Sequence, residues 1–319
     1  MDSSPIMVFG GSGSPGLTQR ICEYLRVPRG LADTLRFSDG NIFVRIGENV
    51  RGQDVYLVQS TGFPPNDNFM ELLFWVDAFK RASAASVTVI LPYFSYAKGD
   101  KKDEPRVSIR ARVCADAIEA AGADRIVTMD LHAPQIQGFF RKPVDNLYAL
   151  PLLAGRLREL EIPSCVVVSP DVGFAKQARR FAAVLSASIA IADKGREGHD
   201  EQASVFEIIG DVAGRAAVIV DDFSVSGGTL TEVAAAVLAR GATEVYAAIT
   251  HGMLTPAALE RIDRSPIRRL FMTDTVEGHL AALPAKVEVV SVCSLFGEAI
   301  KRIHRRESIS QMFAPGEAR

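Results

Sequence analysis

The feature of this sequence that most constrains its fold is a stretch in which an apolar run, an acidic pair, a glycine turn and a helix follow one another. Residues 216–220 (AAVIV) are small or branched and apolar, which predicts a fully buried strand of a parallel sheet. Asp221 and Asp222 follow, where such a strand should stop. Ser226–Thr229 then opens a helix that we expect to run from Leu230 to Arg240. Parallel strands of this kind belong to α/β proteins.

The same stretch predicts an anion site. A glycine-bearing turn at a helix N-terminus presents backbone N–H groups and the positive end of the helix dipole, and phosphate is the natural occupant. Because Asp221 and Asp222 would repel a phosphate, we place them beside hydroxyl groups or a metal ion. The phosphate is left to the turn at Val225–Thr229. A phosphorylated sugar has this combination of groups.

Strands and helices alternate along the rest of the chain, which predicts two α/β units with mainly parallel sheets. The 319 residues are enough for two cores of roughly 150 residues each. We place the boundary between residues 148 and 149, so that the units span 1–148 and 149–319. The last helix, Cys293–His304, is expected to return toward the first unit.

Composition excludes several classes of function. The net charge of −2 supplies no basic field for nucleic acid or anionic lipid. We find no signal peptide and no apolar run of membrane length. The four cysteines lie far apart without a Cys-x-x-Cys pair, so we expect reduced thiols and a cytoplasmic protein.

A glycine-rich turn, Gly10–Pro15, follows the first predicted strand, Met7–Phe9, and invites comparison with dinucleotide-binding loops. Its glycines do not follow the Gly-x-Gly-x-x-Gly spacing, and no acid is well placed about 20 residues further on. Nicotinamide binding is therefore disfavoured.

Two further strand ends carry candidate metal ligands. His132 follows the predicted strand Ile126–Met129, and Asp171 follows Cys165–Ser169. Together with Asp221 they could converge on one divalent cation, since a few oxygen and nitrogen ligands hold Mg²⁺ while leaving positions for water and phosphate. The alternative for His132 is a hydrogen-bonded structural residue.

Two charged segments are predicted to be loops. Lys98–Arg106 is either a solvated loop or a nucleotide-binding flap. Asp193–Asp200 is either a solvated tip or a catalytic lid, in which Lys194 and Arg196 swing over transferring phosphates and neutralise developing charge.

The acidic pair and the Ser-Gly-Gly-Thr turn together resemble the phosphoribosyl-pyrophosphate loop of type I phosphoribosyltransferases. Further motifs, in order from about Val8 to Phe313, resemble those of ribose-phosphate pyrophosphokinase. These motifs are Arg36–Gly40, Glu48–Gly52, Asn66–Asn68, Met70–Leu73, Met129–His132, Gln135–Phe140, Val144–Leu147 and Ser169–Gly173.

The resemblance implies two tandem type I phosphoribosyltransferase-like units. It also implies transfer of the diphosphoryl group of ATP to the 1-hydroxyl of ribose 5-phosphate, which gives 5-phosphoribosyl 1-diphosphate and AMP. Mg²⁺ would be the cofactor and ATP the co-substrate. A homo-oligomer, with dimers assembling to a hexamer, would complete the site, because a base-contacting turn of the first unit works across a subunit boundary in this family.

The resemblance also assigns roles to individual residues. Lys194 and Arg196 would be catalytic, and His132 and Asp171 would lie near Mg²⁺. The ribose 5-phosphate side would comprise Asp221 and Asp222 on the 2- and 3-hydroxyls, and Val225, Ser226, Gly227, Gly228 and Thr229 on the phosphate. The ATP side would comprise Phe37, Asp39, Asn41, Lys98, Gly99, Asp103 and His132.

Five positions depart from the residues common in that family: Asn41, Lys98, Gly99, Gly195 and Val225 stand where Glu, Arg, Gln, Arg and Asp are usual. They leave two alternatives open, an enzyme with a changed donor or acceptor and a weakly active regulatory subunit. A phosphoribosyltransferase acting on a base is disfavoured, because Lys194, Arg196 and the first unit would then be unexplained.

Overall fold

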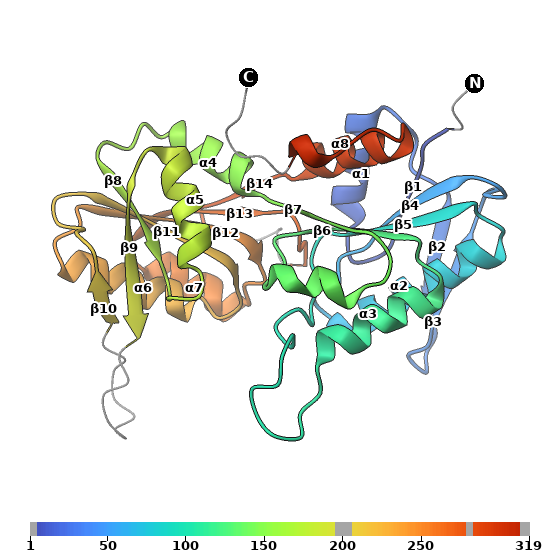
Figure 1. Ribbon diagram of the computed structural model, residues 1–319, viewed down its shortest axis with the longest axis horizontal. Coiled ribbons are helices and arrows are strands. Elements are labelled where there is room, and N and C mark those ends of the chain that lie inside the picture. The colour runs from blue at the N-terminus through green and yellow to red at the C-terminus, as the bar shows by residue number, and fades with distance from the viewer. Residues whose placement is uncertain (1–4, 195–205, 279–282, 313–319) are drawn as a thin grey trace. The chain divides into compact units, whose positions relative to one another are not determined.

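The computed structural model describes residues 5–194, 206–278 and 283–312 (Figure 1). These residues form two compact units. The first unit comprises 5–148, 275–278 and 291–312, and the second comprises 149–194, 206–274 and 283–290. The chain therefore returns to the first unit twice, first for a short segment around residue 277 and again from residue 291.

The first unit is built on five parallel strands in the order β1-β4-β5-β6-β7. These are β1 (Met7–Gly10), β4 (Asp54–Val58), β5 (Ser86–Leu91), β6 (Arg125–Met129) and β7 (Val144–Leu147). Its helices are α1 (Pro15–Leu25), α2 (Pro65–Arg81), α3 (Arg110–Ala121) and α8 (Cys293–His304), with 3-10 turns η1 (Pro134–Phe139) and η3 (Ser310–Met312). Helices α1 and α8 pack together on one face of the sheet, and α2 and α3 on the other (Figure 1). A separate antiparallel hairpin is formed by β2 (Ala32–Arg36) and β3 (Ile42–Ile46).

Helix α2 shows why the first unit folds around this sheet. Its apolar stripe includes Leu72, Val76 and Phe79, and all three side chains are fully buried. Trp75 lies on the same face, with its ring stacked 5.6 Å from that of Phe79. Burying such side chains contributes about 1.5–3 kcal/mol each, so this stripe fixes α2 on the sheet.

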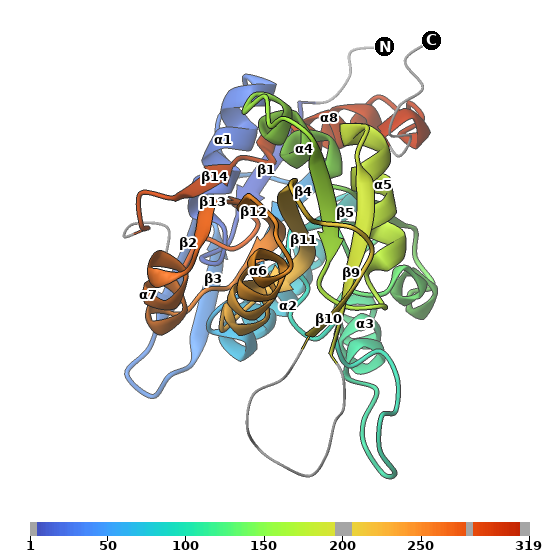
Figure 2. The ribbon, with the colours of Figure 1, turned by 90° about the vertical axis from the view of Figure 1, so that its left-hand side faces the viewer.

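The second unit is built on seven strands in the order β10-β9-β8-β11-β12-β13-β14, all parallel except β10, which is antiparallel to β9. These are β8 (Cys165–Ser169), β9 (Ser188–Lys194), β10 (Phe206–Ile209), β11 (Ala216–Ser224), β12 (Glu244–Gly252), β13 (Ile267–Thr273) and β14 (Val287–Val290). Helices α4 (Leu150–Arg158) and α5 (Ala175–Leu185) cover one face, and α6 (Gly228–Ala239) and α7 (Pro256–Arg264) the other (Figure 2). The predicted α/β class with mainly parallel sheets is confirmed.

The strand order of the second unit creates a switch point between β8 and β11. From β8 the chain builds outward to β9 on one side, and it then returns to place β11 on the other side of β8. Ligands of open α/β sheets bind beyond the carboxyl ends of the strands at such a point, because the adjacent connections diverge there. Asp171 follows β8 and Asp221 lies near the end of β11, so both acids belong to this edge.

Several predicted element boundaries were wrong. Strand β11 does not stop before the acidic pair but runs to Ser224, because it keeps pairing with β12 as far as Gly252. Strand β9 includes Lys194, for which the sequence predicts a loop, because Lys194 pairs with Phe206 of β10. Helix α6 begins at Gly228 rather than Leu230. In the two strands, pairing with a neighbour decided the end, and local sequence does not reveal that pairing.

Candidate active site

An acidic cluster lies at the switch point of the second unit. The pairing of β11 with β8 ends at Ile219, so Asp221 lies just past the end of its neighbour. Burial raises the pKa of Asp221 well above its ordinary value, and the charges of Asp222 and Asp171 raise it further. Asp222 is itself buried and donates its backbone N–H to Oδ1 of Asp221 at 2.9 Å. The cluster therefore favours groups that stabilise negative charge, such as hydroxyl donors or a cation.

Asp171 brings a third carboxylate to this cluster. Its Oδ1 accepts the Phe174 N–H at 2.8 Å, just before α5 begins, and its side chain is exposed. Carboxylate oxygens suit Mg²⁺. Within the described ranges, however, no three His, Cys, Asp or Glu side chains are grouped to hold a metal ion. A magnesium ion here would need water or substrate oxygens to complete its shell.

The turn between β11 and α6 has the features of an anion cradle. Gly227 adopts a left-handed conformation with φ +68°, and a Cβ there would lie 3.2 Å from Ile262. Helix α6 has no side-chain cap at its N-terminus and no acidic residue in its first turn. Ser226 and Thr229 are exposed, and the Ser226 Oγ accepts the Gly228 N–H at 3.3 Å. The N–H groups of α6 that follow Gly228, together with the hydroxyls of Ser226 and Thr229, are thus available to an anion.

The turn between β2 and β3 carries three predicted ATP-side residues. Phe37 is 54% exposed, with its ring 6.1 Å from that of Phe43. The backbone N–H and side-chain amide of Asn41 donate to the two oxygens of Asp39 at 3.0 and 2.7 Å, and these bonds lower the pKa of Asp39. Asn41 therefore fixes the orientation of the Asp39 carboxylate. A Glu at this position would have no amide to donate.

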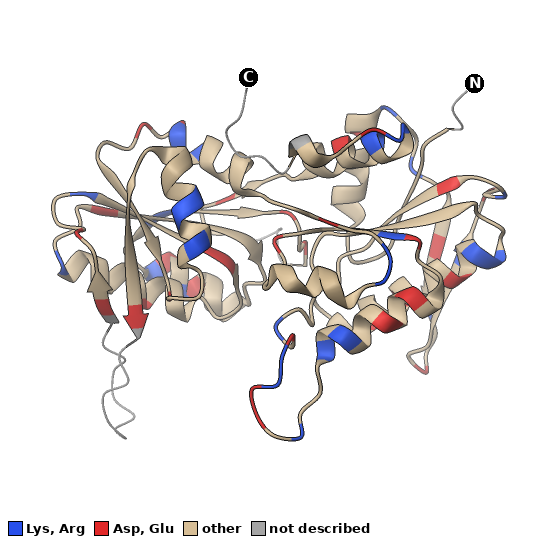
Figure 3. Ribbon diagram, in the orientation of Figure 1, with Lys and Arg blue, Asp and Glu red and all other residues tan. Residues whose placement is uncertain are grey.

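The segment 98–106 is a loop of the first unit that joins β5 to α3, and basic and acidic residues alternate along it (Figure 3). Lys98 and Asp103 are exposed, and Asp103 lies 3.9 Å from the Lys101 ammonium. Gly99 is buried, and a Cβ there would lie 2.6 Å from Nε of Arg110. Arg110 therefore occupies the space that a side chain at position 99 would need.

The remaining predicted residues are placed only in part. His132 is exposed and follows Asp130, whose φ of +38° marks a sharp turn after β6. His132 belongs to the first unit and Asp171 to the second. Lys194 ends β9, but its side chain lies outside the described residues, as do Arg196 and Gly195.

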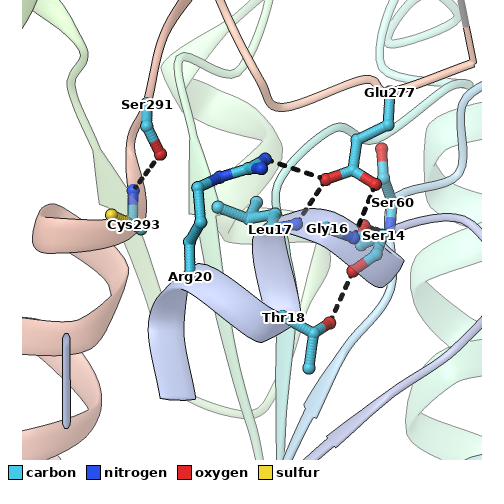
Figure 4. A network of polar contacts seen from close by, with 9 residues as sticks. All are labelled: Ser14, Gly16, Leu17, Thr18, Arg20, Ser60, Glu277, Ser291 and Cys293. Atoms are coloured by element: carbon cyan, nitrogen blue, oxygen red, sulfur yellow. Dashed lines mark hydrogen bonds and ion pairs between the residues drawn. The ribbon is translucent and has the colours of Figure 1, made fainter. Parts of the chain in front are cut away.

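The glycine-rich turn of the first unit leads into helix α1, and a carboxylate of the same chain binds the N-terminus of this helix (Figure 4). The carboxylate of Glu277 accepts the Gly16 N–H at 2.9 Å and also the Leu17 N–H. Arg20 donates to the same carboxylate at 3.1 Å. A negative charge at this end of α1 offsets the helix dipole, so an internal carboxylate takes the position that an anionic ligand would otherwise have.

A second internal carboxylate lies beside the same turn. Glu71 of α2 is 1% exposed. It accepts the Ser12 N–H at 2.9 Å, the Thr34 hydroxyl at 2.9 Å and the Trp75 Nε1–H at 3.1 Å. The residue borders a hollow of about 400 Å³ whose rim carries the Arg36–Asp67 ion pair. Glu71 thus connects helix α2 with the glycine-rich turn and with strand β2.

Sequence reasoning missed three polar residues that shape these regions: Glu71, Glu277 and Arg261. Glu277 contacts a helix 260 residues earlier in the chain, and Arg261 of α7 contacts the turn at Ser226, 35 residues earlier. No local pattern marks such contacts. The helical spacing of Glu71 within α2 was visible, but its burial was not.

Comparison with known proteins decides the family. Residues 6–122 match the N-terminal domain of ribose phosphate pyrophosphokinase, and residues 197–314 match the phosphoribosyl synthetase-associated domain. The ribose-phosphate pyrophosphokinase of Rhizobium meliloti is 47% identical over 308 residues, which cover 96% of this chain and 99% of that protein. The chain belongs to the ribose-phosphate pyrophosphokinase family. The family resemblance predicted from the sequence is confirmed.

Other members of the family agree over nearly the whole length. The ribose-phosphate pyrophosphokinase of Caldanaerobacter subterraneus is 47% identical over 312 residues, which cover 98% of each chain. The crystal structure of phosphoribosylpyrophosphate synthetase from Mycobacterium smegmatis superposes with a TM-score of 0.89 at 35% identity, covering 95% of this chain and all of that one. The α/β fold described above is therefore that of a solved member of the ribose-phosphate pyrophosphokinase family.

Proposed function

We propose that this protein is an active ribose-phosphate diphosphokinase. It transfers the diphosphoryl group of ATP to the 1-hydroxyl of ribose 5-phosphate and releases AMP. The observation that carries the proposal is the edge of the second unit, where an acidic cluster and an uncapped glycine turn adjoin at the switch point. Relatives of the same name, 47% identical over nearly the full length, support it.

The edge of the second unit offers separate places for the parts of the sugar. Backbone N–H groups and hydroxyls of the turn Val225–Thr229 bind the 5-phosphate. Asp221 and Asp222 accept hydrogen bonds from the 2- and 3-hydroxyls. This arrangement holds carbon 1 in place, and fixing the acceptor in this way lowers the entropic part of the barrier.

The reaction is an in-line displacement at the β-phosphorus of ATP. The 1-hydroxyl oxygen forms the new P–O bond and loses its proton to solvent. The bond from the β-phosphorus to the α,β-bridging oxygen breaks, and AMP leaves with that oxygen. Lys194 and Arg196 stabilise the negative charge that develops on the transferring group. Phe37, Asp39 and Asn41, with Lys98, Gly99, Asp103 and His132, bind ATP.

Magnesium ion is the cofactor in this proposal. The proposed magnesium ligands are Asp171 and His132, and the acidic cluster that raises the pKa of Asp221 would favour a cation beside Asp171. Bound Mg²⁺ would neutralise the phosphates of ATP. The first unit is assigned the ATP side and the oligomer contacts, and the second the ribose 5-phosphate turn.

A panel of substrates tests this function. AMP release is measured with ATP and Mg²⁺ against ribose 5-phosphate and other pentose phosphates, and with other nucleoside triphosphates as donors. The proposal requires ribose 5-phosphate and ATP to give the highest kcat/KM. Turnover restricted to a different donor or acceptor would mean that Asn41, Lys98, Gly99, Gly195 and Val225 have changed the specificity. No turnover with any pair would favour a regulatory subunit.

The proposal includes a cytoplasmic homo-oligomer, with dimers assembling to a hexamer. Cys22 and Cys114 are buried free thiols, and burial raises the pKa of each to about 11, as suits unreactive thiols in a reducing compartment. No helix within the described ranges combines the length and apolarity needed to cross a bilayer. Light scattering tests the assembly: a monomer at micromolar concentration that still turns over would contradict a shared site.

A further inference from the structure

The turn assigned to the 5-phosphate is held from one side by hydrogen bonds to consecutive carbonyl groups. The Met253 N–H donates to the carbonyl of Ser224 at 2.9 Å, and the Thr255 N–H donates to that of Val225 at 3.3 Å. Both donors lie between the end of β12 and the start of α7. The carbonyls of Ser224, just before the turn, and of Val225, its first residue, are therefore fixed by the backbone of the segment that joins β12 to α7.

The third carbonyl is fixed by a side chain. Nη1 of Arg261, in the last turn of α7, donates to the carbonyl oxygen of Ser226 at 3.1 Å. In a trans peptide the C=O and N–H bonds point in opposite directions. Holding the Ser226 carbonyl toward α7 therefore turns the N–H of Gly227 away from α7.

This peptide is the one in the turn that most needs support. Gly227 has φ +68°, and glycine populates several backbone conformations at little cost, so the Ser226–Gly227 peptide can rotate unless its carbonyl is held. Arg261 supplies that hold. Its Nη1 would also lie only 3.3 Å from a Cβ at Gly228, which places its positive charge beside the first turn of α6.

We propose that Arg261 is a positioning residue for ribose 5-phosphate. It aims the Gly227 N–H at the 5-phosphate and adds positive charge behind the turn, without entering the sugar site. The inference rests on the proposed function, because it takes the turn to be the 5-phosphate site.

The chain offers a matched control in Arg264. Both arginines lie in the last turn of α7, both are exposed, and both border the same open hollow of about 390 Å³. Arg264 pairs with Glu260 instead of the turn. Truncating either arginine removes the same favourable charge from the helix C-terminus, so any difference between the two variants reports on the contact with Ser226.

The experiment compares Arg261→Ala, Arg261→Lys and Arg264→Ala with wild type, with kcat and the KM of each substrate measured separately. We expect Arg261→Ala to raise the KM for ribose 5-phosphate about three- to tenfold, since one hydrogen bond from a charged donor is lost. The KM for ATP should stay at its wild-type value. Lysine at 261 should restore part of the affinity, because an ammonium also donates to a carbonyl. Arg264→Ala should behave as wild type.

Two further measurements separate the possible failures. Calorimetric titration with ribose 5-phosphate reports binding without turnover, and thermal unfolding verifies that each variant is folded. Equal effects of Arg261→Ala and Arg264→Ala, or an unchanged KM in Arg261→Ala, would overturn the role of Arg261 alone. A wild type that neither binds nor converts ribose 5-phosphate would overturn the proposed function itself.

Discussion

The substitution Asp221→Asn is expected to stabilise the protein while removing its affinity for ribose 5-phosphate. Burial and the charges of Asp222 and Asp171 raise the pKa of Asp221 in the folded state, so the folded chain binds this proton more tightly than the unfolded chain. The contribution of Asp221 to stability is therefore greatest at acid pH. It falls as the pH rises above the unfolded pKa of about 3.9, until the folded pKa is reached.

The size of the effect follows from proton linkage. Across that pH range the wild type loses about 1.4 kcal/mol of stability per pH unit relative to a neutral side chain. In a unit of this size each kcal/mol corresponds to about 2–4 °C in the midpoint of thermal unfolding. Asparagine keeps an oxygen that accepts the Asp222 N–H, so the substitution removes the charge and leaves this hydrogen bond in place.

The assay is thermal unfolding of wild type and Asp221→Asn between pH 4 and pH 8, with and without ribose 5-phosphate. The midpoint of the variant should rise above that of wild type by an amount that grows with pH. Ribose 5-phosphate should raise the midpoint of wild type but not of Asp221→Asn. Asp263→Asn, which alters an exposed acid on α7, should keep the wild-type response to the sugar. Parallel midpoint curves for wild type and Asp221→Asn across the pH range would refute the reasoning.

Two predictions concern the internal carboxylates of the first unit. Glu277→Gln should lower the free energy of unfolding by about 1–2 kcal/mol, because an amide offsets the α1 dipole less well than a carboxylate and cannot form an ion pair with Arg20. Urea denaturation measures this loss, and an unchanged urea midpoint would contradict it. Glu71→Ala should lower the free energy of unfolding by about 3 kcal/mol or more, since the Ser12 N–H and the Trp75 indole N–H lose their acceptor. A variant with the wild-type urea midpoint would show that Glu71 does not hold these segments together.

The sequence predicted helix and strand ends well where burial and the residues that end an element act locally. Strand β8 and helix α8 have the predicted ends, because an apolar run and an amphipathic repeat define them. The end of β11 was wrong because pairing with β12 extends it through the acidic pair. Register with a neighbouring strand depends on residues far away in the chain.

In the candidate site, too, the features formed by neighbouring residues could be predicted and the contacts between distant segments could not. The acids and the glycine turn could be predicted, because a strand, a turn and a helix N-terminus adjoin in sequence. The contacts of Arg261 and Glu277 could not, because each joins segments that only the fold brings together. The space that a side chain at position 99 would need is likewise filled by Arg110, the first residue of α3. The loop between the two residues brings them together, and no local pattern predicts that contact.

The most direct test of the central claim follows both products of one reaction. With ATP, Mg²⁺ and ribose 5-phosphate, the protein should form one AMP for each 5-phosphoribosyl 1-diphosphate, measured by chromatography and phosphorus NMR. Lys194→Ala should lose most of this turnover while Lys142→Ala, which alters an exposed lysine of the first unit, retains it. Release of ADP in place of AMP, or equal turnover in Lys194→Ala and wild type, would contradict the account.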